Sequence, residues 1–181
     1  LQKMTEQQFD RNTWQTPQYV FNAMNRKYSF DLDACADHNN ALCRLFLTAL
    51  NDITKTETQS AVKFGSRVWM NPPYSNPMPF VKAAIELMRE RDCTVVMLLP
   101  ADKSTKWYRL ALTAATEVID VIGGRINFTH PITGEEVKGN NKGSMFVILD
   151  PNNQSQIQGA VELEFLKVRG GYYLEQVKNE R

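Results

Sequence analysis

"RVWMNPPYSNPMPFVKAAIELM", residues 67–88, places a strand, a stiff turn and a helix in immediate succession. Residues 67–70 form a short, mostly apolar run typical of a strand. Asn76 and Pro77 then signal a helix start, and an apolar stripe at helical spacing follows: Phe80, Ala83, Ala84, Leu87 and Met88. "CTVVMLLP", residues 93–100, comes next and resembles a central parallel strand in its density of Val and Leu. This order predicts an α/β fold, a mainly parallel twisted sheet with helices on both faces.

The neighbouring segments continue the alternation. "YSFDLDA", residues 28–34, alternates apolar and polar residues and predicts a strand that ends near Asp33. Before it, Thr16 and Pro17 predict a helix start, with a capping hydroxyl followed by Pro at the first helical position. After residue 100, we expect a helix over 103–115 and a strand over 117–122.

Three other stretches give weaker signals. Residues 39–50, "NNALCRLFLTAL", fit a helix followed by a strand. Residues 55–65, "KTETQSAVKFG", are polar and predict a surface loop. Near the C-terminus, residues 160–168 and 172–177 flank Gly170 and Gly171, which favours a terminal hairpin.

Length and composition limit the class of protein. The chain has 181 residues, of which 43% are hydrophobic, so it is expected to form one domain, residues 1–181, with a full core. We expect residues 1–13 to be a flexible N-terminus and 151–181 a C-terminal extension. No stretch reaches the roughly 18 apolar residues of a membrane helix, and no apolar signal segment opens the sequence, so we expect a cytoplasmic protein without a membrane partner. The net charge of +1 neither requires nor excludes a nucleic-acid partner.

The cysteines point to free thiols. Cys35, Cys43 and Cys93 are odd in number and unclustered, which argues against a disulfide framework. Together with His38, the first two match no familiar zinc spacing. We therefore expect no metal site.

The turn at residues 71–74, Asn-Pro-Pro-Tyr, carries groups suited to one kind of chemistry. Asn71 offers a carbonyl acceptor, and the carbonyls of Pro72 and Pro73 are presented by a stiff backbone without N–H groups. Tyr74 adds a flat ring for stacking. Two acceptors beside a stacking face suit a planar amine such as N6 of adenine, whose lone pair is delocalised into the ring. Holding both N–H groups favours a pyramidal nitrogen with a localised lone pair. The alternative is a turn that only joins a strand to a helix.

The sequence resembles the amino-methyltransferases, in which "NPPY" after a strand is the catalytic motif. More narrowly, it resembles the phage-type DNA N6-adenine methyltransferases of the Dam group. The matching stretches occur in that group's order: "WQTPQYVFNAMN" (14–25), "FDLDACADHNNALC" (30–43), "VWMNPPYSN" (68–76), "VVMLLPADKSTKWY" (95–108), "GGRINF" (123–128) and "GSMFVIL" (143–149).

The resemblance implies a Rossmann-like fold, S-adenosylmethionine as cofactor, double-stranded DNA as partner, and roles for named residues. Asn71, Pro72, Pro73 and Tyr74 would bind the target base, with Asn71 and the Pro72 carbonyl on the amine. The cofactor would contact Trp14, Thr16, Pro17, Asp33, Ala34, Cys35, Asp52 and Asn71. Many of these enzymes carry a Gly-rich loop after the first strand, whereas this chain has Ala34, Cys35 and Ala36 there. Without the resemblance, the alternative for Asp33 is a turn former or helix cap, for Cys35 a small packing residue, and for Trp14 a core residue.

A base in a duplex must be flipped out before its amine can react, which requires contacts to the DNA backbone. Basic and hydroxyl side chains suited to this occur at three places: after the strand at 93–100, after Gly123 and Gly124, and in the loop at 129–142. They are Lys103, Ser104, Lys106, Arg125, Lys138 and Lys142. A solvated surface is the alternative for each. That loop is also the main candidate for target recognition.

Several functional questions stay open at the level of sequence. The same chemistry on an RNA base or a glutamine amide is an alternative, as is a non-catalytic DNA-binding domain with this fold. A nucleotide-dependent oxidoreductase is disfavoured because no G-x-G-x-x-G follows a strand. The resemblance suggests a phage or prophage protein in a bacterial host, associated with the nucleoid, with a GATC-like target. A partner nuclease of restriction-modification type and the choice between monomer and homodimer remain undecided.

Overall fold

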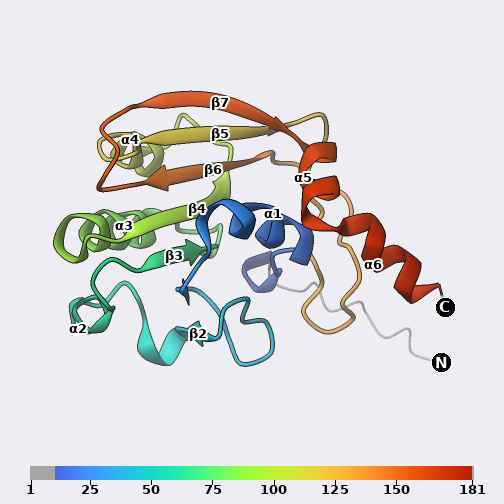
Figure 1. Ribbon diagram of the computed structural model, residues 1–181, viewed down its shortest axis with the longest axis horizontal. Coiled ribbons are helices and arrows are strands. Elements are labelled where there is room, and N and C mark those ends of the chain that lie inside the picture. The colour runs from blue at the N-terminus through green and yellow to red at the C-terminus, as the bar shows by residue number, and fades with distance from the viewer. Residues whose placement is uncertain (1–10, 181) are drawn as a thin grey trace, which may run out of the picture.

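The computed structural model describes residues 11–180, which form an α/β protein with one seven-stranded sheet (Figure 1). Its α-helices are α1 (Gln18–Tyr28), α2 (Thr56–Ala61), α3 (Met78–Arg91), α4 (Lys106–Leu112), α5 (Leu163–Gly170) and α6 (Tyr172–Asn179), with 3₁₀ turns η1 (Arg11–Thr13) and η2 (Ala49–Asn51). Its strands are β1 (Leu32–Asp33), β2 (Leu45–Phe46), β3 (Arg67–Met70), β4 (Thr94–Pro100), β5 (Glu117–Ile122), β6 (Ser144–Leu149) and β7 (Ile157–Glu162).

The sheet is mainly parallel, as the sequence predicts. Its strand order is β2-β1-β3-β4-β6-β5-β7. β2, β1, β3 and β4 are parallel neighbours, and β7 is parallel to β5. β6 is reversed, because it pairs antiparallel with both β4 and β5. β4 is therefore central as expected, but parallel to its neighbour on one side only.

Alternate residues of β4 enter the two halves of the core. Val95, Met97 and Leu99 pack with α3 and α4 on one face of the sheet. Val96 and Leu98 pack with α1 and α5 on the other face, where these two helices lie side by side (Figure 1). A strand with apolar residues on both faces is buried on both faces, which explains why its sequence shows a continuous apolar run.

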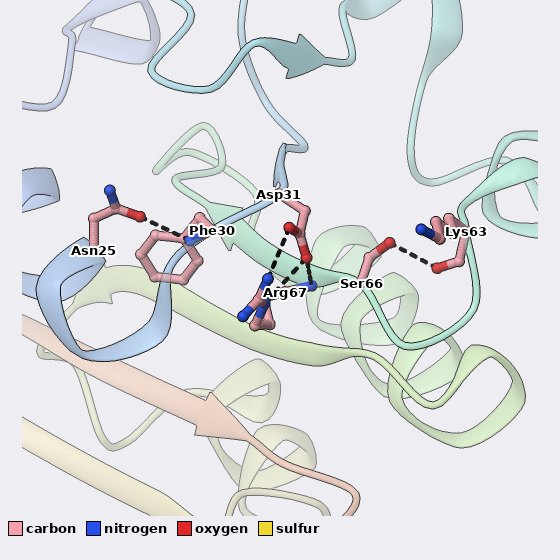
Figure 2. A network of polar contacts seen from close by, with 6 residues as sticks. All are labelled: Asn25, Phe30, Asp31, Lys63, Ser66 and Arg67. Atoms are coloured by element: carbon pink, nitrogen blue, oxygen red, sulfur yellow. Dashed lines mark hydrogen bonds and ion pairs between the residues drawn. The ribbon is translucent and has the colours of Figure 1, made fainter.

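An ion pair fixes β1 against β3 near their amino ends. Arg67 donates through Nε and Nη2 to the Asp31 carboxylate at 3.1 and 3.0 Å, and its backbone N–H donates to Asp31 Oδ2 at 2.9 Å (Figure 2). The Asp31 N–H returns a bond to the Arg67 carbonyl at 2.8 Å. These contacts set the register in which Leu32 faces Val68 and Asp33 faces Trp69. As a result, Ala34 and Asn71 leave the sheet at the same edge.

The predicted surface loop at 55–65 is wrong, because residues 56–61 form α2. This helix has no buried residue of its own, so it shows no apolar stripe. Two contacts hold it in place: the Gln59 side chain donates to the Ile53 carbonyl at 3.0 Å, and Val62, just past the helix, is buried.

The predicted terminal hairpin is also wrong. Residues 157–162 form the edge strand β7, and the chain then continues as α5 and α6. Gly171 has φ +80° and lies between the two helices, so the Gly-Gly pair ends one helix and starts another. Gly170 lies against the backbone of Tyr19, where a Cβ atom would not fit. The tight contact of α5 with α1 thus depends on a residue that the sequence suggested for a turn.

Two further N-terminal expectations need correction. α1 begins after Pro17, which is the N-cap residue itself and makes no side-chain cap. The Thr16 hydroxyl is therefore not a helix cap; its partner is described below. In the stretch 39–50 the expected helix is absent, and β2 adds a two-residue strand beside β1. The predicted flexibility of residues 1–10 lies outside the described residues, and residues 11–13 form η1.

None of the helices described between residues 11 and 180 combines the length and apolar character needed to span a bilayer.

Candidate active site

A cavity of about 790 Å³ opens beyond the carboxyl ends of β1 and β3. It falls in the size range of small-molecule sites and lies at the edge where α/β sheets bind ligands. Its walls include eight residues predicted for the site, namely Trp14, Thr16, Asp33, Ala34, Cys35, Asp52, Asn71 and Pro73. The fold brings together these residues from four separate parts of the sequence, at 14–16, 33–35, 52 and 71–73.

The loop after β1 is built around the Asp33 carboxylate. Asp33 is buried, and its two oxygens accept the backbone N–H groups of Cys35 at 3.3 Å and Leu42 at 3.1 Å. Burial raises the pKa of this carboxyl, and the two N–H donors oppose that rise. The carboxylate therefore organises the backbone that lines the cavity, which is also what a turn-forming Asp does.

Small residues follow Asp33 along the cavity wall. Ala34, Cys35 and Ala36 all line it, so the backbone lies near the cavity even without a glycine. Burial is the largest factor that raises the pKa of the Cys35 thiol, and the charges of Asp33 and Asp52 add to it. Burial likewise raises the pKa of Cys43 to about 12. Both thiols stay protonated, which fits packing better than nucleophilic chemistry.

Asp52 lines the cavity from the segment after η2. Its Oδ1 atom accepts from the Thr54 N–H at 2.9 Å and the Thr54 hydroxyl at 2.8 Å. The side chain is partly exposed, which leaves its second oxygen able to accept a hydrogen bond.

Within residues 11–180, the Asn71 side-chain amide makes a hydrogen bond through its NH₂ group but not through its oxygen. Its Nδ2 atom donates to Thr16 Oγ1 at 2.7 Å. Its Oδ1 atom is buried and has no hydrogen-bond partner among the described residues. An orphaned buried acceptor is rare in native proteins and requires an explanation such as an absent ligand. The unused acceptor is the atom that the sequence assigned to the target amine.

Pro72, Pro73 and Tyr74 line a second, small cavity of about 30 Å³ next to Asn71. This cavity shares Asn12, Trp14, Tyr74 and Phe128 with a larger one of about 310 Å³ that reaches residues 140–142. The Tyr74 ring meets the Phe128 ring edge to face, and the Trp14 ring stacks on that of Phe128, with the two centroids 6.4 Å apart. Trp14, Tyr74 and Phe128 thus form an aromatic wall next to the unpaired Asn71 Oδ1 atom.

The N-terminal segment and the loop at 129–133 cover the site together. Gln15 and Thr129 exchange two backbone hydrogen bonds, each 2.9 Å long. Pro131 and Ile132 line the same cavity as Trp14 and Thr16. Pro17 is buried at the start of α1 and is not part of that cavity's wall. Its expected contact with a cofactor has no geometric support here.

The candidate DNA-binding residues lie on the surface around this edge. Lys103 pairs with Asp120 at 2.7 Å, and Lys142 lies 3.8 Å from Asp102. Arg125 donates to the Asn140 carbonyl at 2.9 Å. Ser104, Lys106 and Lys138 are exposed. Of the six, Lys142 is the one that lines the cavity beside Tyr74.

Sequence reasoning assigned no role to several residues that line these cavities. Phe128 lies in the stretch "GGRINF", where an aromatic residue directly after Asn127 was the available signal. Phe80 was assigned only to the apolar stripe of α3, although it also lines the main cavity, as do Leu50, Ile53 and His38. Within residues 11–180, no group of three His, Cys, Asp or Glu side chains could hold a metal ion.

The mainly parallel sheet, the cavity beyond its strands and the Asn-Pro-Pro-Tyr turn after β3 define a Rossmann-like methyltransferase. The comparisons agree with this class and narrow it. A family model described as DNA N-6-adenine-methyltransferase (Dam) matches residues 3–172. A DNA N-6-adenine-methyltransferase of Haemophilus phage HP1 (strain HP1c1) is 38% identical over 153 residues, which cover 83% of this chain and 86% of that protein. Another, of Escherichia phage T1, is 37% identical over 163 residues, covering 82% of this chain and 66% of that protein.

The chain therefore belongs to the DNA N-6-adenine-methyltransferase (Dam) family and is by family an adenine-specific DNA methyltransferase. The resemblance noted from its motifs is confirmed. The roles of individual residues remain predictions.

Proposed function

We propose that the protein transfers a methyl group from S-adenosylmethionine to N6 of an adenine that is flipped out of duplex DNA. The observation that carries this proposal is the Asn71 carbonyl oxygen, buried without a partner where the main cavity meets the aromatic wall. The family match supports the adenine acceptor.

The main cavity fits a cofactor of this size and chemistry. It is large enough for a nucleoside with an amino-acid tail, and its polar groups converge from several loops. Ala34, Cys35 and Ala36 would allow close approach, and Asp52 would accept a hydrogen bond from the sugar of the adenosine part. When bound, S-adenosylmethionine supplies a methyl group activated by its sulfonium.

The role of the chain is to hold and prepare the amine. Asn71 Oδ1 would accept one N–H of the adenine amine, and the Pro72 carbonyl the other. Among the described residues, no backbone N–H donates to the Pro72 carbonyl, which is therefore available to the amine. Two acceptors on one NH₂ group favour a pyramidal nitrogen. The lone pair is then localised on that nitrogen and no longer delocalised into the purine ring. The stabilisation then acts on charge that develops in the transition state.

The aromatic wall would hold the base ring. Tyr74 presents its ring next to the two acceptors, and Phe128 supports it from the side. Stacking on such rings is typically worth about 1–3 kcal/mol per base. This contribution would offset part of the few kcal/mol needed to flip a nucleotide.

The decisive experiment measures transfer of labelled methyl from S-adenosylmethionine to unmethylated duplex DNA, with product analysis by digestion to nucleosides. We expect N6-methyladenine with the parent protein and a loss of roughly 100- to 1000-fold with Asn71→Ala. Asn152→Ala is a matched control, because Asn152 is exposed in the turn before β7. Equal rates for the parent and Asn71→Ala would overturn the residue assignment. Label on RNA or on a glutamine amide, with DNA unlabelled, would replace the acceptor.

A further inference from the structure

The contact between Thr16 and Asn71 joins two parts of the site that are 55 residues apart in sequence. Thr16 lies in the segment before α1, and Asn71 follows β3. The Asn71 amide donates to the Thr16 hydroxyl at 2.7 Å, and both side chains are partly buried in the wall of the main cavity.

The Thr16 contact and the unpaired position beside it together favour one orientation of the Asn71 amide. In the observed orientation the NH₂ group is bonded and the carbonyl oxygen is the orphan. Rotation by half a turn would place the NH₂ group at the orphan position. Buried N–H groups without an acceptor are rarer in native proteins than under-satisfied carbonyls, so the observed orientation is favoured. It is also the only orientation that offers an acceptor to an amine.

The Thr16 hydroxyl is held on a fixed piece of backbone. On one side, Gln15 is tied to Thr129 by its two backbone hydrogen bonds. On the other side, Pro17 is buried, and its carbonyl accepts the N–H of Val20 at 3.0 Å as α1 begins. Because both neighbours are anchored, the hydroxyl provides a rigid point against which the amide is oriented.

We propose that Thr16 is a positioning residue for the reaction: it orients the Asn71 amide so that Oδ1 faces the target amine. This inference rests on the proposed function. It assigns to Thr16 a role toward the acceptor base, in addition to its place in the wall of the cofactor cavity.

The test compares Thr16→Val, which keeps the shape and removes the hydroxyl, with Thr16→Ser, which keeps the hydroxyl. For each, the single-turnover rate of DNA methylation, the Kd for S-adenosylmethionine and the thermal midpoint are measured. Small displacements of reacting groups cost on the order of 100-fold in rate, so we expect Thr16→Val to be roughly 10- to 100-fold slower, with its cofactor Kd nearly unchanged. Thr16→Ser should keep most of the parent rate.

Three outcomes would overturn the proposal: a full rate for Thr16→Val, a loss confined to cofactor Kd, or a Thr16→Ser variant as slow as Thr16→Val. A second readout does not depend on methyl transfer. In the parent protein, the side-chain NH₂ signal of Asn71, assigned by its disappearance in Asn71→Asp, should exchange with water much more slowly than that of Asn152. Equal exchange would also overturn the proposal. If the parent fails to methylate DNA, the proposed function fails, while the exchange measurement still reports on the Thr16–Asn71 contact.

Discussion

The rings of Tyr74 and Phe128 lie edge to face, with centroids 5.4 Å apart and an interplanar angle of 83°. The Tyr74 hydroxyl is buried next to the Ser144 hydroxyl at the start of β6, and neither makes a fully formed hydrogen bond within the described part of the chain. Burial raises the pKa of Tyr74, so the group is a neutral phenol under all ordinary conditions. We therefore expect the ring of Tyr74, and not its hydroxyl, to contribute to binding the target base.

This relationship predicts that Tyr74→Phe keeps both stability and methyl transfer. A buried hydroxyl whose contact with Ser144 falls short of a full hydrogen bond adds a desolvation cost with little compensation, so its removal is neutral or slightly stabilising. Tyr74→Ala removes the stacking face, and we expect a loss of about 1–3 kcal/mol in transition-state stabilisation, or roughly 5- to 150-fold in kcat/KM. Steady-state rates on unmethylated DNA and urea unfolding check both expectations. A Tyr74→Phe variant as inactive as Tyr74→Ala would show that the hydroxyl has a role.

Strong local patterns predicted the elements that build the site. Residues 68–70 and 95–100 are continuous apolar runs, and the stripe from Phe80 to Met88 has a clear helical period, so β3, β4 and α3 appear where expected. The chemistry of the turn at 71–74 was also readable, because proline and asparagine have specific backbone and hydrogen-bonding properties.

The failures occur where tertiary contacts replace local pattern. α2 has no buried stripe to detect. Gly170 suggested a turn, although its small size serves a helix contact with Tyr19, which no sequence window reveals. The Thr16 hydroxyl resembled a cap and instead bonds to Asn71, and Phe128 reaches the site because of the Gln15–Thr129 bridge. Contacts over such long sequence separations leave no periodic signal.

The ion pair between Asp31 and Arg67 predicts a specific dependence of stability on pH. The Arg67 guanidinium and its backbone N–H hold the pKa of Asp31 below its ordinary value in the folded protein. A carboxyl with a lowered folded pKa contributes stability above its unfolded pKa of about 3.9, and that contribution is lost as pH falls through the folded pKa. Because both side chains are nearly half exposed, at 48% and 41%, screening limits the effect to about 0.5–1 kcal/mol.

We therefore expect Asp31→Asn to lower the free energy of unfolding by that amount at pH 7. The difference from the parent should shrink as the pH is lowered from about 4 toward 2, because the parent carboxyl then loses its charge. Urea unfolding across this range measures both quantities. Glu90→Gln, at an exposed position on α3, serves as the control. A difference that stays constant down to the acid end would contradict the ion-pair origin.

Lys142 is the basic side chain best placed for a DNA contact, because it lines the cavity beside Tyr74 and its pairing with Asp102 is loose at 3.8 Å. A lysine that contacts a phosphate releases a bound counterion, so its removal weakens binding and reduces the slope of log K against log salt by about one. We expect this result for Lys142→Ala, measured as duplex DNA affinity between 50 and 200 mM salt, roughly the range over which such slopes are resolved. Lys63→Ala is the matched control, because Lys63 is exposed and precedes the amino end of β3, the edge opposite the cavity. Equal slopes for Lys142→Ala and the parent would move the DNA path away from the loop at 129–142.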